Sequence, residues 1–400
     1  MSANDTHAFE ANLDRHPSNY IPLSPVSFLA RAASAFADKV AVIDGERRYT
    51  YAQLLDRCIR LASGLAQLGV KRLDTVAIIA SNIPEMIEAH FAVPMLGAVL
   101  NPLNTRLDAA NIAFSLMHGS AKVLIVDAEY APLVRQALQQ VDREIVVIDI
   151  PSPDGPATPL GTHAYEALLA AGDTNYDWPG VTDEWQSLCL LYTSGTTGDP
   201  KGVVYSHRGA YLSALGNGFS FGLTFESIYL WTLPMFHCSG WSYPWAVVAA
   251  GGTQICLRKG EPAQIFRLIA EHRVTHLCGA PIVLNMLAHA PSDQRVPFQH
   301  KVTVATGGAA PPSSVFRSME ALGFRVTHPM GLPRLTDPRL PASSSRNGTR
   351  CRMTNALPGW RDRALPTRWS RRSRSLIPRR WFRFRVTARP SARSWCVAIP

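Results

Sequence analysis

One run of hydroxyl, glycine and lysine residues has the composition of a ligand-binding loop. Residues 192–207 read YTSGTTGDPKGVVYSH, and its polar members are Thr193, Ser194, Gly195, Thr196, Thr197, Gly198 and Lys201. Glycines let backbone N–H groups approach a ligand, hydroxyls donate to phosphate oxygens, and lysine adds a compact positive charge. Lys201 follows Pro200 and precedes Gly202, which is not the order of a Walker A loop. The run predicts a polyphosphate loop rather than a flexible polar turn.

A second glycine-rich segment lies about a hundred residues later and follows a predicted strand. It reads TGGAAPP, and its candidate binding residues are Gly307, Gly308, Ala309, Ala310 and Pro311. Glycine leaves no side chain between the backbone and a flat ring, so a nucleotide base could stack there. Alone this signal is weak, but its position downstream of the phosphate loop favours a base-binding role.

Residues 192–207 resemble the signature phosphate loop of the adenylate-forming superfamily, which includes acyl-CoA synthetases, luciferases and peptide-synthetase adenylation domains. The resemblance runs from about Phe28 to His328. It implies an enzyme with ATP, Mg²⁺ and CoA as reactants and cofactors. A carboxylate would attack the α-phosphorus of ATP to give an acyl-adenylate and pyrophosphate, and the CoA thiol would then displace AMP. Because an anion must approach a polyanion, such a site supplies positive charge, Mg²⁺ and fixed donors.

The resemblance also implies roles for individual residues. Lys201 and the loop hydroxyls would hold the β- and γ-phosphates, and residues 307–311 would form the adenine site. His237, in the PMFH segment after a predicted strand, would lie near the substrate carboxylate, where an imidazole could orient it. A purely structural role for His237 is an equal alternative. No metal ligand is assigned in this chain.

Two other segments have a structural interpretation as the favoured one. Trp241, Tyr243 and Trp245 could line an apolar tunnel for an acyl chain, but general core packing is the more common role of such aromatics. NPLNTRL, residues 101–107, is taken as a strand-to-helix turn with Asp108 near the helix start.

The elements that must position these residues alternate between apolar strands and amphipathic helices. An Asp-Gly pair at 44–45 predicts a hairpin within 40–51, followed by a helix over 52–68. Further strands are predicted at 76–80, 122–127, 144–150, 187–194, 229–233, 253–257, 275–279, 301–306 and 325–328. Further helices are predicted at 84–97, 107–118, 130–140, 165–171, 208–217, 241–250, 262–272, 281–289 and 312–322. This order predicts an α/β fold with mostly parallel sheets flanked by helices, and ligands at the carboxyl ends of strands.

The charge of the chain is unevenly distributed. The 400 residues hold 40 basic and 30 acidic side chains, a formal net charge of +10. Seventeen arginines and two acidic residues follow His328, so the preceding part holds 23 basic against 28 acidic residues. The seven cysteines have no metal-like spacing and are expected to be buried free thiols. The polar N-terminus and the absence of a long apolar run predict a cytoplasmic protein without a transmembrane segment.

The residues after His328 depart from the superfamily pattern. In the family this strand runs into a Tyr-Gly-x-Thr-Glu motif, whose Tyr stacks on adenine and whose Glu binds Mg²⁺, whereas this chain reads HPMGLPRLTDP. Codon degeneracy allows the neighbouring frame from His328 to Pro338 to encode Ser-Tyr-Gly-Leu-Thr-Glu-Val-Tyr-Gly-Pro. The same frame from Arg346 to Trp360 allows Glu-Trp-Asp-Ala-Leu-Pro-His-Asp-Glu-Arg-Ala-Ala-Arg-Leu. We interpret the tail as the product of a one-nucleotide frameshift.

The expected organisation has three parts. Residues 1–27 are an N-terminal extension, residues 28–328 are a truncated AMP-binding domain with subdomains at 28–180 and 181–328, and residues 329–400 are an aberrant, disordered tail. The small C-terminal domain of the family, with its catalytic lysine, is expected to be missing. The sequence predicts an acyl-CoA synthetase for a medium-chain fatty acid. We expect this chain to be an inactive or impaired version of that enzyme. The alternatives are an adenylate-forming enzyme that does not use CoA, and nucleic-acid or membrane binding by the basic tail.

Overall fold

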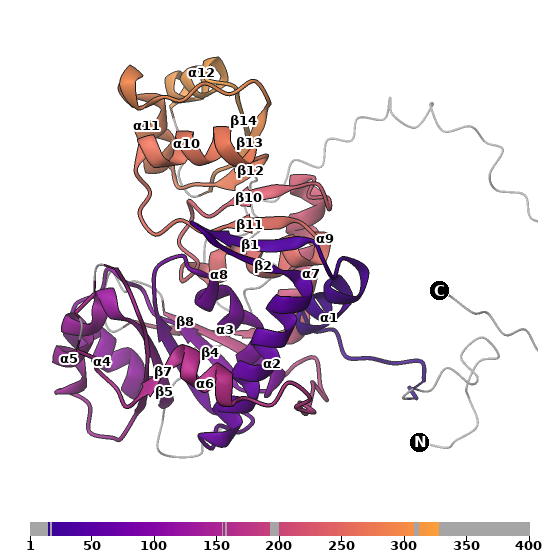
Figure 1. The fold of residues 1–400 in the computed structure, drawn as a ribbon, viewed down its shortest axis with the longest axis vertical. Helices are drawn as coiled ribbons and strands as arrows, with labels where there is room; N and C mark the ends of the chain where they lie inside the picture. Colours follow the sequence, from indigo (N-terminus) through magenta and orange to yellow (C-terminus); the bar gives the residue numbers. More distant parts are fainter. Residues whose placement is uncertain are drawn as a thin grey trace, which may run out of the picture. The chain divides into compact units, whose positions relative to one another are not determined.

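The protein is described by a computed structural model that covers residues 15–16, 18–153, 155–156, 158–192, 200–307 and 312–327. All of these residues belong to one compact unit, Met1–Ser344. Within this unit two seven-stranded sheets are each flanked by helices (Figure 1). The α/β fold with mostly parallel strands is therefore confirmed, while the tail predicted to be disordered lies outside the described residues. No helix in the described ranges is long and apolar enough to cross a membrane.

The first sheet has the strand order β7-β6-β5-β3-β4-β8-β9. Its strands, in chain order, are β3 (Thr75–Ile79), β4 (Val99–Pro102), β5 (Ala121–Asp127), β6 (Val146–Ile150), β7 (His163–Ala164), β8 (Ser187–Tyr192) and β9 (Gly202–Ser206). All neighbours are parallel except β8 and β9, which pair antiparallel with Tyr192 opposite Gly202. The predicted phosphate loop thus connects the two strands of a hairpin.

The second sheet has the order β14-β13-β12-β10-β11-β1-β2. Its strands are β1 (Val40–Asp44), β2 (Arg47–Thr50), β10 (Ile228–Leu230), β11 (Thr253–Ile255), β12 (His276–Cys278), β13 (Val302–Ala305) and β14 (Phe324–Thr327). The predicted hairpin forms, since β1 and β2 are antiparallel, and the other pairs are parallel. The first strands of the chain therefore complete a sheet that is otherwise built from its second half.

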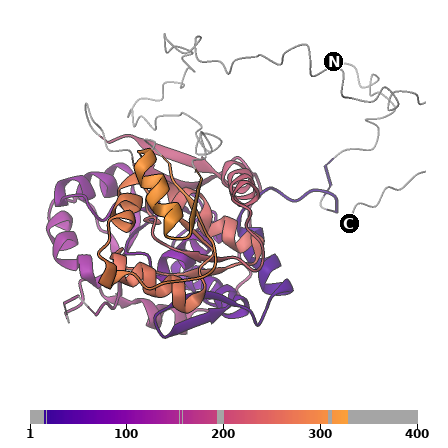
Figure 2. The ribbon, with the colours of Figure 1, turned by 90° about the horizontal axis from the view of Figure 1, so that it is seen from above.

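Helices form three layers around the two sheets. The middle layer is α1 (Val26–Ala35), α2 (Tyr51–Gln67), α3 (Pro84–Met95), α6 (Tyr165–Ala171), α7 (His207–Phe221) and α9 (Tyr243–Ala250). Side chains of these helices and of both sheets form one core. Helices α4 (Ala109–His118) and α5 (Ala131–Leu138) cover the other face of the first sheet. Helices α10 (Pro262–His272), α11 (Pro281–Ala288) and α12 (Ser313–Ala321) cover the second sheet, nearest the viewer in Figure 2.

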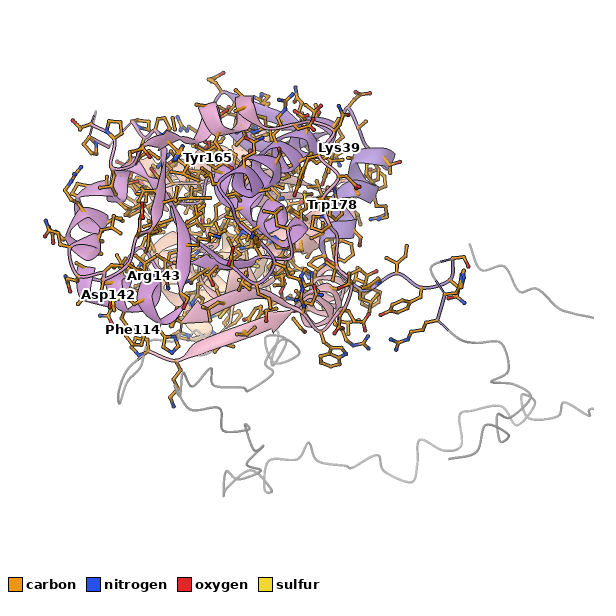
Figure 3. All side chains as sticks on the ribbon, turned by 90° about the horizontal axis from the view of Figure 1, so that it is seen from below. Lys39, Phe114, Asp142, Arg143, Tyr165 and Trp178 are labelled. Carbon is orange, nitrogen blue, oxygen red and sulfur yellow. The ribbon has the colours of Figure 1, made fainter. Side chains whose placement is uncertain are left out.

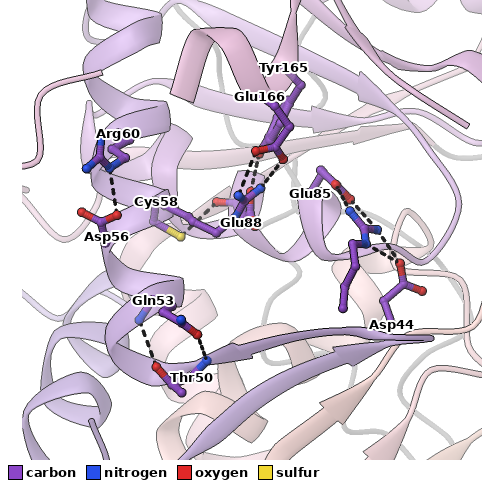
Figure 4. Close-up of polar contacts among 12 residues, drawn as sticks. Asp44, Thr50, Gln53, Asp56, Cys58, Arg60, Glu85, Glu88, Tyr165 and Glu166 are labelled. Carbon is purple, nitrogen blue, oxygen red and sulfur yellow. Dashed lines mark hydrogen bonds and ion pairs between the residues drawn. The ribbon is translucent and has the colours of Figure 1, made fainter. Parts of the chain in front are cut away.

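A buried carboxylate ties three of the middle helices together. Glu88 on α3 accepts from Arg57 Nε of α2 at 2.6 Å and from the Tyr165 hydroxyl of α6 at 2.7 Å (Figure 4). Tyr165 is also labelled among all the side chains in Figure 3. Glu166 binds the same guanidinium. Because a charge in a core is tolerated only when it is paired and hydrogen-bonded, this network fixes the relative positions of the helices.

Most predicted elements are confirmed within two or three residues. Helix α2 begins with a capping box, in which the Thr50 side chain accepts from Gln53 N and the Gln53 side chain accepts from Thr50 N. The sequence analysis did not predict α1, β4, β7, β9 or the short turn α8 (Cys238–Trp241). Strand β4 ends in Pro102 and β9 lies inside the string taken as a loop, so neither shows the continuous apolar run of the other strands.

Candidate active site

His237 lies where two cavities of the chain meet. It follows β10 and the PMF segment, and it precedes α8. The two cavities, of about 480 and about 590 Å³, share the lining residues Asn104, Phe236 and His237. His237 is exposed to solvent, and partial desolvation, followed by the nearby charge of Arg106, lowers its pKa, so its imidazole is neutral at neutral pH. A neutral ring at this point can donate one hydrogen bond and accept another.

The first cavity adjoins both ends of the predicted phosphate loop. Tyr192 at the end of β8 and Pro200 before β9 both line it. Lys201, the next residue, is exposed. Thr193, Ser194, Gly195, Thr196, Thr197 and Gly198 lie outside the described residues. The hairpin therefore brings the flanks of the loop to the cavity that His237 also lines.

The second cavity lies at the carboxyl ends of strands from both sheets. Arg106, Tyr130 and Arg258 are among its polar lining residues. Arg258 Nη1 lies 2.7 Å from Oδ2 of the fully buried Asp127, which connects the segment after β11 to the end of β5. The arrangement matches the expectation that ligands collect at strand carboxyl ends. Asn104 and Arg106 belong to the segment that the sequence analysis treated as structural, and both face these cavities.

Asn82 holds the segment that leads to His237, although its sequence context did not single it out. Its Nδ2 donates to the carbonyls of Trp231 at 2.8 Å and Leu233 at 3.0 Å, and its Oδ1 accepts from Met235 N at 2.8 Å. One side chain after β3 thus fixes three backbone groups after β10. The only available signal was its location just past a predicted strand.

A left-handed turn follows His237 directly. Cys238, Ser239, Gly240, Trp241 and Ser242 all have φ between 47° and 65°. Non-glycine residues avoid this region, so the surrounding contacts must hold the turn.

Contacts from both sheets and α7 supply that support. Asn217 Nδ2 donates to the Trp241 carbonyl at 2.7 Å, and the Ser239 hydroxyl lies 3.2 Å from Cys189 Sγ. A Cβ placed on Gly240 would lie 2.7 Å from the Trp231 ring. Contacts from α7, from β8 and from the Trp231 ring therefore hold the turn beside His237.

The predicted base site begins at the end of β13. A Cβ on Gly307 would lie 2.7 Å from the Trp241 ring, so glycine there permits the close contact between the two segments. The buried hydroxyl of Thr306, one residue earlier, has no hydrogen-bond partner. Gly308, Ala309, Ala310 and Pro311 lie outside the described residues. Trp241 is thus placed against the start of the predicted adenine segment.

Three further expectations concern other residues of the chain. Tyr243 and Trp245 are buried in the core, with the Trp245 indole donating to the His90 carbonyl at 3.0 Å, so the favoured packing role is confirmed. The five cysteines in the described ranges are free thiols, and all but the partly buried Cys238 are buried. Asp108 caps α4 as expected, accepting from Asn111 N at 2.9 Å.

Comparison with known proteins identifies the family. Residues 29–332 match the family model described as AMP-binding enzyme. The chain is 47% identical over 341 residues to an acetate/butyrate–CoA ligase of Arabidopsis thaliana and 45% identical over 341 residues to an acetate–CoA ligase of Humulus lupulus; each match covers 82% of this chain. The chain spans 60% of the length of these relatives.

Solved structures give the same result for the fold. A putative long-chain-fatty-acid CoA ligase from Rhodopseudomonas palustris is 28% identical with a TM-score of 0.65, covering 75% of this chain and 72% of its own. The anthranilate CoA ligase AuaEII, at 20% identity, shares the fold with a TM-score of 0.67 over 76% of this chain and 60% of its own. From the extent of the family match, we conclude that the chain belongs to the AMP-binding enzymes.

Proposed function

We propose that the intact form of this protein activates a carboxylic acid with ATP to an acyl-adenylate and then transfers the acyl group to CoA. The proposal rests on the position of His237, which lines two cavities. One of these cavities is also lined by Tyr192 and Pro200, the residues that flank the phosphate loop. A site that holds an acid beside a triphosphate needs this adjacency, since attack requires the reacting atoms in contact and in line.

Each predicted residue then has a definite task. Lys201 and the hydroxyls of Ser194, Thr196 and Thr197 bind the β- and γ-phosphates, and residues 307–311 bind the adenine. The neutral His237 donates a hydrogen bond to the substrate carboxylate and orients it toward the α-phosphorus. A cationic imidazolium would instead hold the carboxylate by charge and oppose its attack. Asn82 and the left-handed turn keep that imidazole in place.

Mg²⁺, when bound, neutralises phosphate charge during the displacement. The part of the chain that the structure describes contains no group of three or more His, Cys, Asp or Glu side chains that could hold a metal ion. Mg²⁺ is commonly held by one or two carboxylates together with substrate phosphates. No step is assigned to the described residues through that ion.

The acid is the finer part of the proposal. A medium-chain fatty acid is the candidate from the sequence, whereas the names of the relatives favour acetate, butyrate or another short acid for those proteins. A panel of straight-chain acids from about two to about twelve carbons distinguishes the medium-chain from the short-chain substrate. The assay is AMP release by a protein whose reading frame is restored. The cytoplasmic location is likewise proposed, and microscopy of a tagged chain tests it.

We further propose that the 400-residue chain itself is inactive because its reading frame shifts near residue 328. The end of the family match at residue 332 supports this, since the similarity stops where the expected motif is replaced by HPMGLPRLTDP. Without the Tyr and Glu of that motif, several groups that act together in the transition state are missing.

Pyrophosphate exchange tests both parts of the proposal. We expect no exchange above background from the 400-residue chain with any acid of the panel, and exchange plus acyl-CoA formation from a protein whose frame is restored after residue 327. Exchange by the 400-residue chain would contradict the inactivity. A restored protein that folds but neither exchanges pyrophosphate nor forms a thioester would contradict the function.

The two alternative functions, adenylate formation without CoA and binding by the basic tail, each have a specific test. Acyl-AMP release without thioester formation by the restored protein would support an adenylate-forming enzyme that does not use CoA. Salt-dependent binding of DNA or anionic vesicles that is lost on deleting residues 329–400 would support a role for the basic tail, where 17 arginines lie.

A further inference from the structure

His118, the last residue of α4, contacts both strands that flank the phosphate loop. Tyr192 ends β8 and Gly202 begins β9, and the two residues are paired across the hairpin. The Nδ1 atom of His118 lies 2.9 Å from the Tyr192 hydroxyl. Its Cε1 atom lies 3.7 Å from the position that a Cβ on Gly202 would occupy. One side chain of α4 therefore reaches both ends of the hairpin loop.

The Tyr192 hydroxyl is bonded to α4 at two points about one turn apart. It donates to the Ser115 carbonyl at 3.3 Å. A hydroxyl has one proton, so in the bond to His118 the Nδ1–H donates and the Tyr192 oxygen accepts. Burial raises the pKa of Tyr192, so the hydroxyl keeps the proton that this arrangement needs. Helix α4 thus holds the end of β8 through one donor and one acceptor.

Neighbouring residues of α4 support the bond between His118 and Tyr192. The His118 ring stacks on Phe114, with centroids 5.3 Å apart and an angle of 19° between the planes. It meets the Tyr192 ring edge to face at 5.7 Å. A Cβ on Gly119 would lie 3.1 Å from the Tyr192 hydroxyl, so glycine there leaves the hydroxyl room to reach the helix. Residues on both sides of His118 therefore favour this one arrangement.

We propose that His118 is a positioning residue for the triphosphate, which acts by holding Tyr192 and Gly202 against α4. This inference rests on the proposed function, in which the loop between these two residues binds the β- and γ-phosphates. Tyr192 and Ser115 line the cavity of about 480 Å³ that His237 also lines, whereas His118 is not among the described residues that line it. His118 therefore acts through Tyr192 and does not touch a substrate.

The position of His118 predicts which substrate its loss affects. A hairpin end that is no longer bonded to α4 samples other positions, and this lowers the fraction of protein whose loop ends are placed to bind the triphosphate. The acid is oriented by His237, and the segment that leads to His237 is held by Asn82. Loss of the His118 side chain should thus weaken ATP binding and leave acid binding unchanged.

Proteolysis of the 400-residue chain tests the anchoring without any need for activity. A lysine-specific protease can cleave between Lys201 and Gly202, since Lys201 is exposed. We expect His118→Leu to raise the rate of this cleavage about fivefold, as the loss of one hydrogen bond predicts, relative to cleavage after the exposed Lys71 in the same sample. His118→Asn should be cleaved at the wild-type rate, because its amide can donate to the Tyr192 hydroxyl.

Two further substitutions complete the comparison. Tyr192→Phe removes the hydroxyl and keeps the ring, so it should match His118→Leu, and the double variant should be cleaved no faster than either single one. His289→Leu is the matched control, at an exposed histidine that also lies at the end of a helix, and it should leave the cleavage rate unchanged. Circular dichroism checks that each variant is folded. Wild-type cleavage rates in His118→Leu and Tyr192→Phe, or an equal increase in His289→Leu, would overturn the proposal.

Kinetics of the protein with a restored reading frame test the positioning itself. We expect His118→Leu to raise KM for ATP about fivefold and to change KM for the acid by less than about twofold, with His118→Asn close to the wild type. Equal increases in both KM values, or no increase for ATP, would overturn the role of His118. A restored wild-type protein that folds without exchanging pyrophosphate would instead contradict the proposed function, and the cleavage rates would still decide whether His118 anchors the hairpin.

Discussion

Asn82 is the side chain on which the placement of His237 most directly depends. Its amide satisfies three backbone groups between Trp231 and Met235. A sequence alone cannot distinguish this asparagine from the many that follow strands, because its function lies in contacts about 150 residues away.

We expect Asn82→Ala to lower the free energy of unfolding by about 2–3 kcal/mol, because two carbonyls and one N–H lose their partner. Urea unfolding measures this. Asn111→Ala is the matched control, since the Asn111 side chain donates to the neighbouring Asp108 and its loss should change stability by less than about 0.5 kcal/mol. Equal losses in the two variants would show that Asn82 has no special structural role.

Two buried histidines give the fold a pH dependence. Burial lowers the pKa of His90 and of His207 to about 4 each. In the unfolded chain the value is about 6.5. The unfolded state therefore binds more protons between these values, so stability is complete above pH ~6.5 and falls as the pH drops toward ~4.

We expect His207→Asn, which keeps a group able to bond to the Ser24 hydroxyl, to reduce the slope of stability against pH in this window by up to about 1.4 kcal/mol per pH unit. Urea unfolding at several pH values measures the slope. His289→Gln, at an exposed histidine, should leave it unchanged. The explanation fails if His207→Asn and the wild-type chain have parallel pH curves.

Among the elements, the left-handed turn at Cys238–Ser242 was the least predictable. Its residues, CSGWS, include one glycine, and nothing in their types requires five consecutive positive φ values. The conformation is imposed by Asn217 of α7, Cys189 of β8 and Trp231, which follows β10. Regular elements were predictable because their apolar periodicity is local, whereas this turn is determined by its tertiary surroundings.

We expect Gly240→Ala to destabilise the chain by more than about 2 kcal/mol, since the added Cβ would meet the Trp231 ring and the residue must keep a positive φ. Gly216→Ala on the open side of α7 is the control. It should be neutral or stabilising by up to about 1 kcal/mol, because alanine favours the helix. Thermal unfolding compares the two, and equal melting temperatures would contradict a constrained turn.

On the scale of the whole molecule, the sequence predicted the fold and the family correctly because their signals are extended. Alternating apolar strands and helices cover some 300 residues, and the motifs occur in the right order along them. The cavities could not be predicted in the same way, since Asn104, Arg106 and Arg258 meet His237 only after both sheets are assembled. Most of the predicted phosphate loop and base segment remains a prediction, as it lies outside the described residues.

We propose that this chain is a CoA ligase whose reading frame shifts near residue 328. Sequencing the coding DNA across the codon for His328, and translating the neighbouring frame, tests it most directly. We expect that frame to encode Ser-Tyr-Gly-Leu-Thr-Glu at this position and to continue with the sequence of an acyl-CoA ligase. A neighbouring frame that meets an early stop codon or encodes no such motif would contradict the account and would make residues 329–400 a genuine part of the protein.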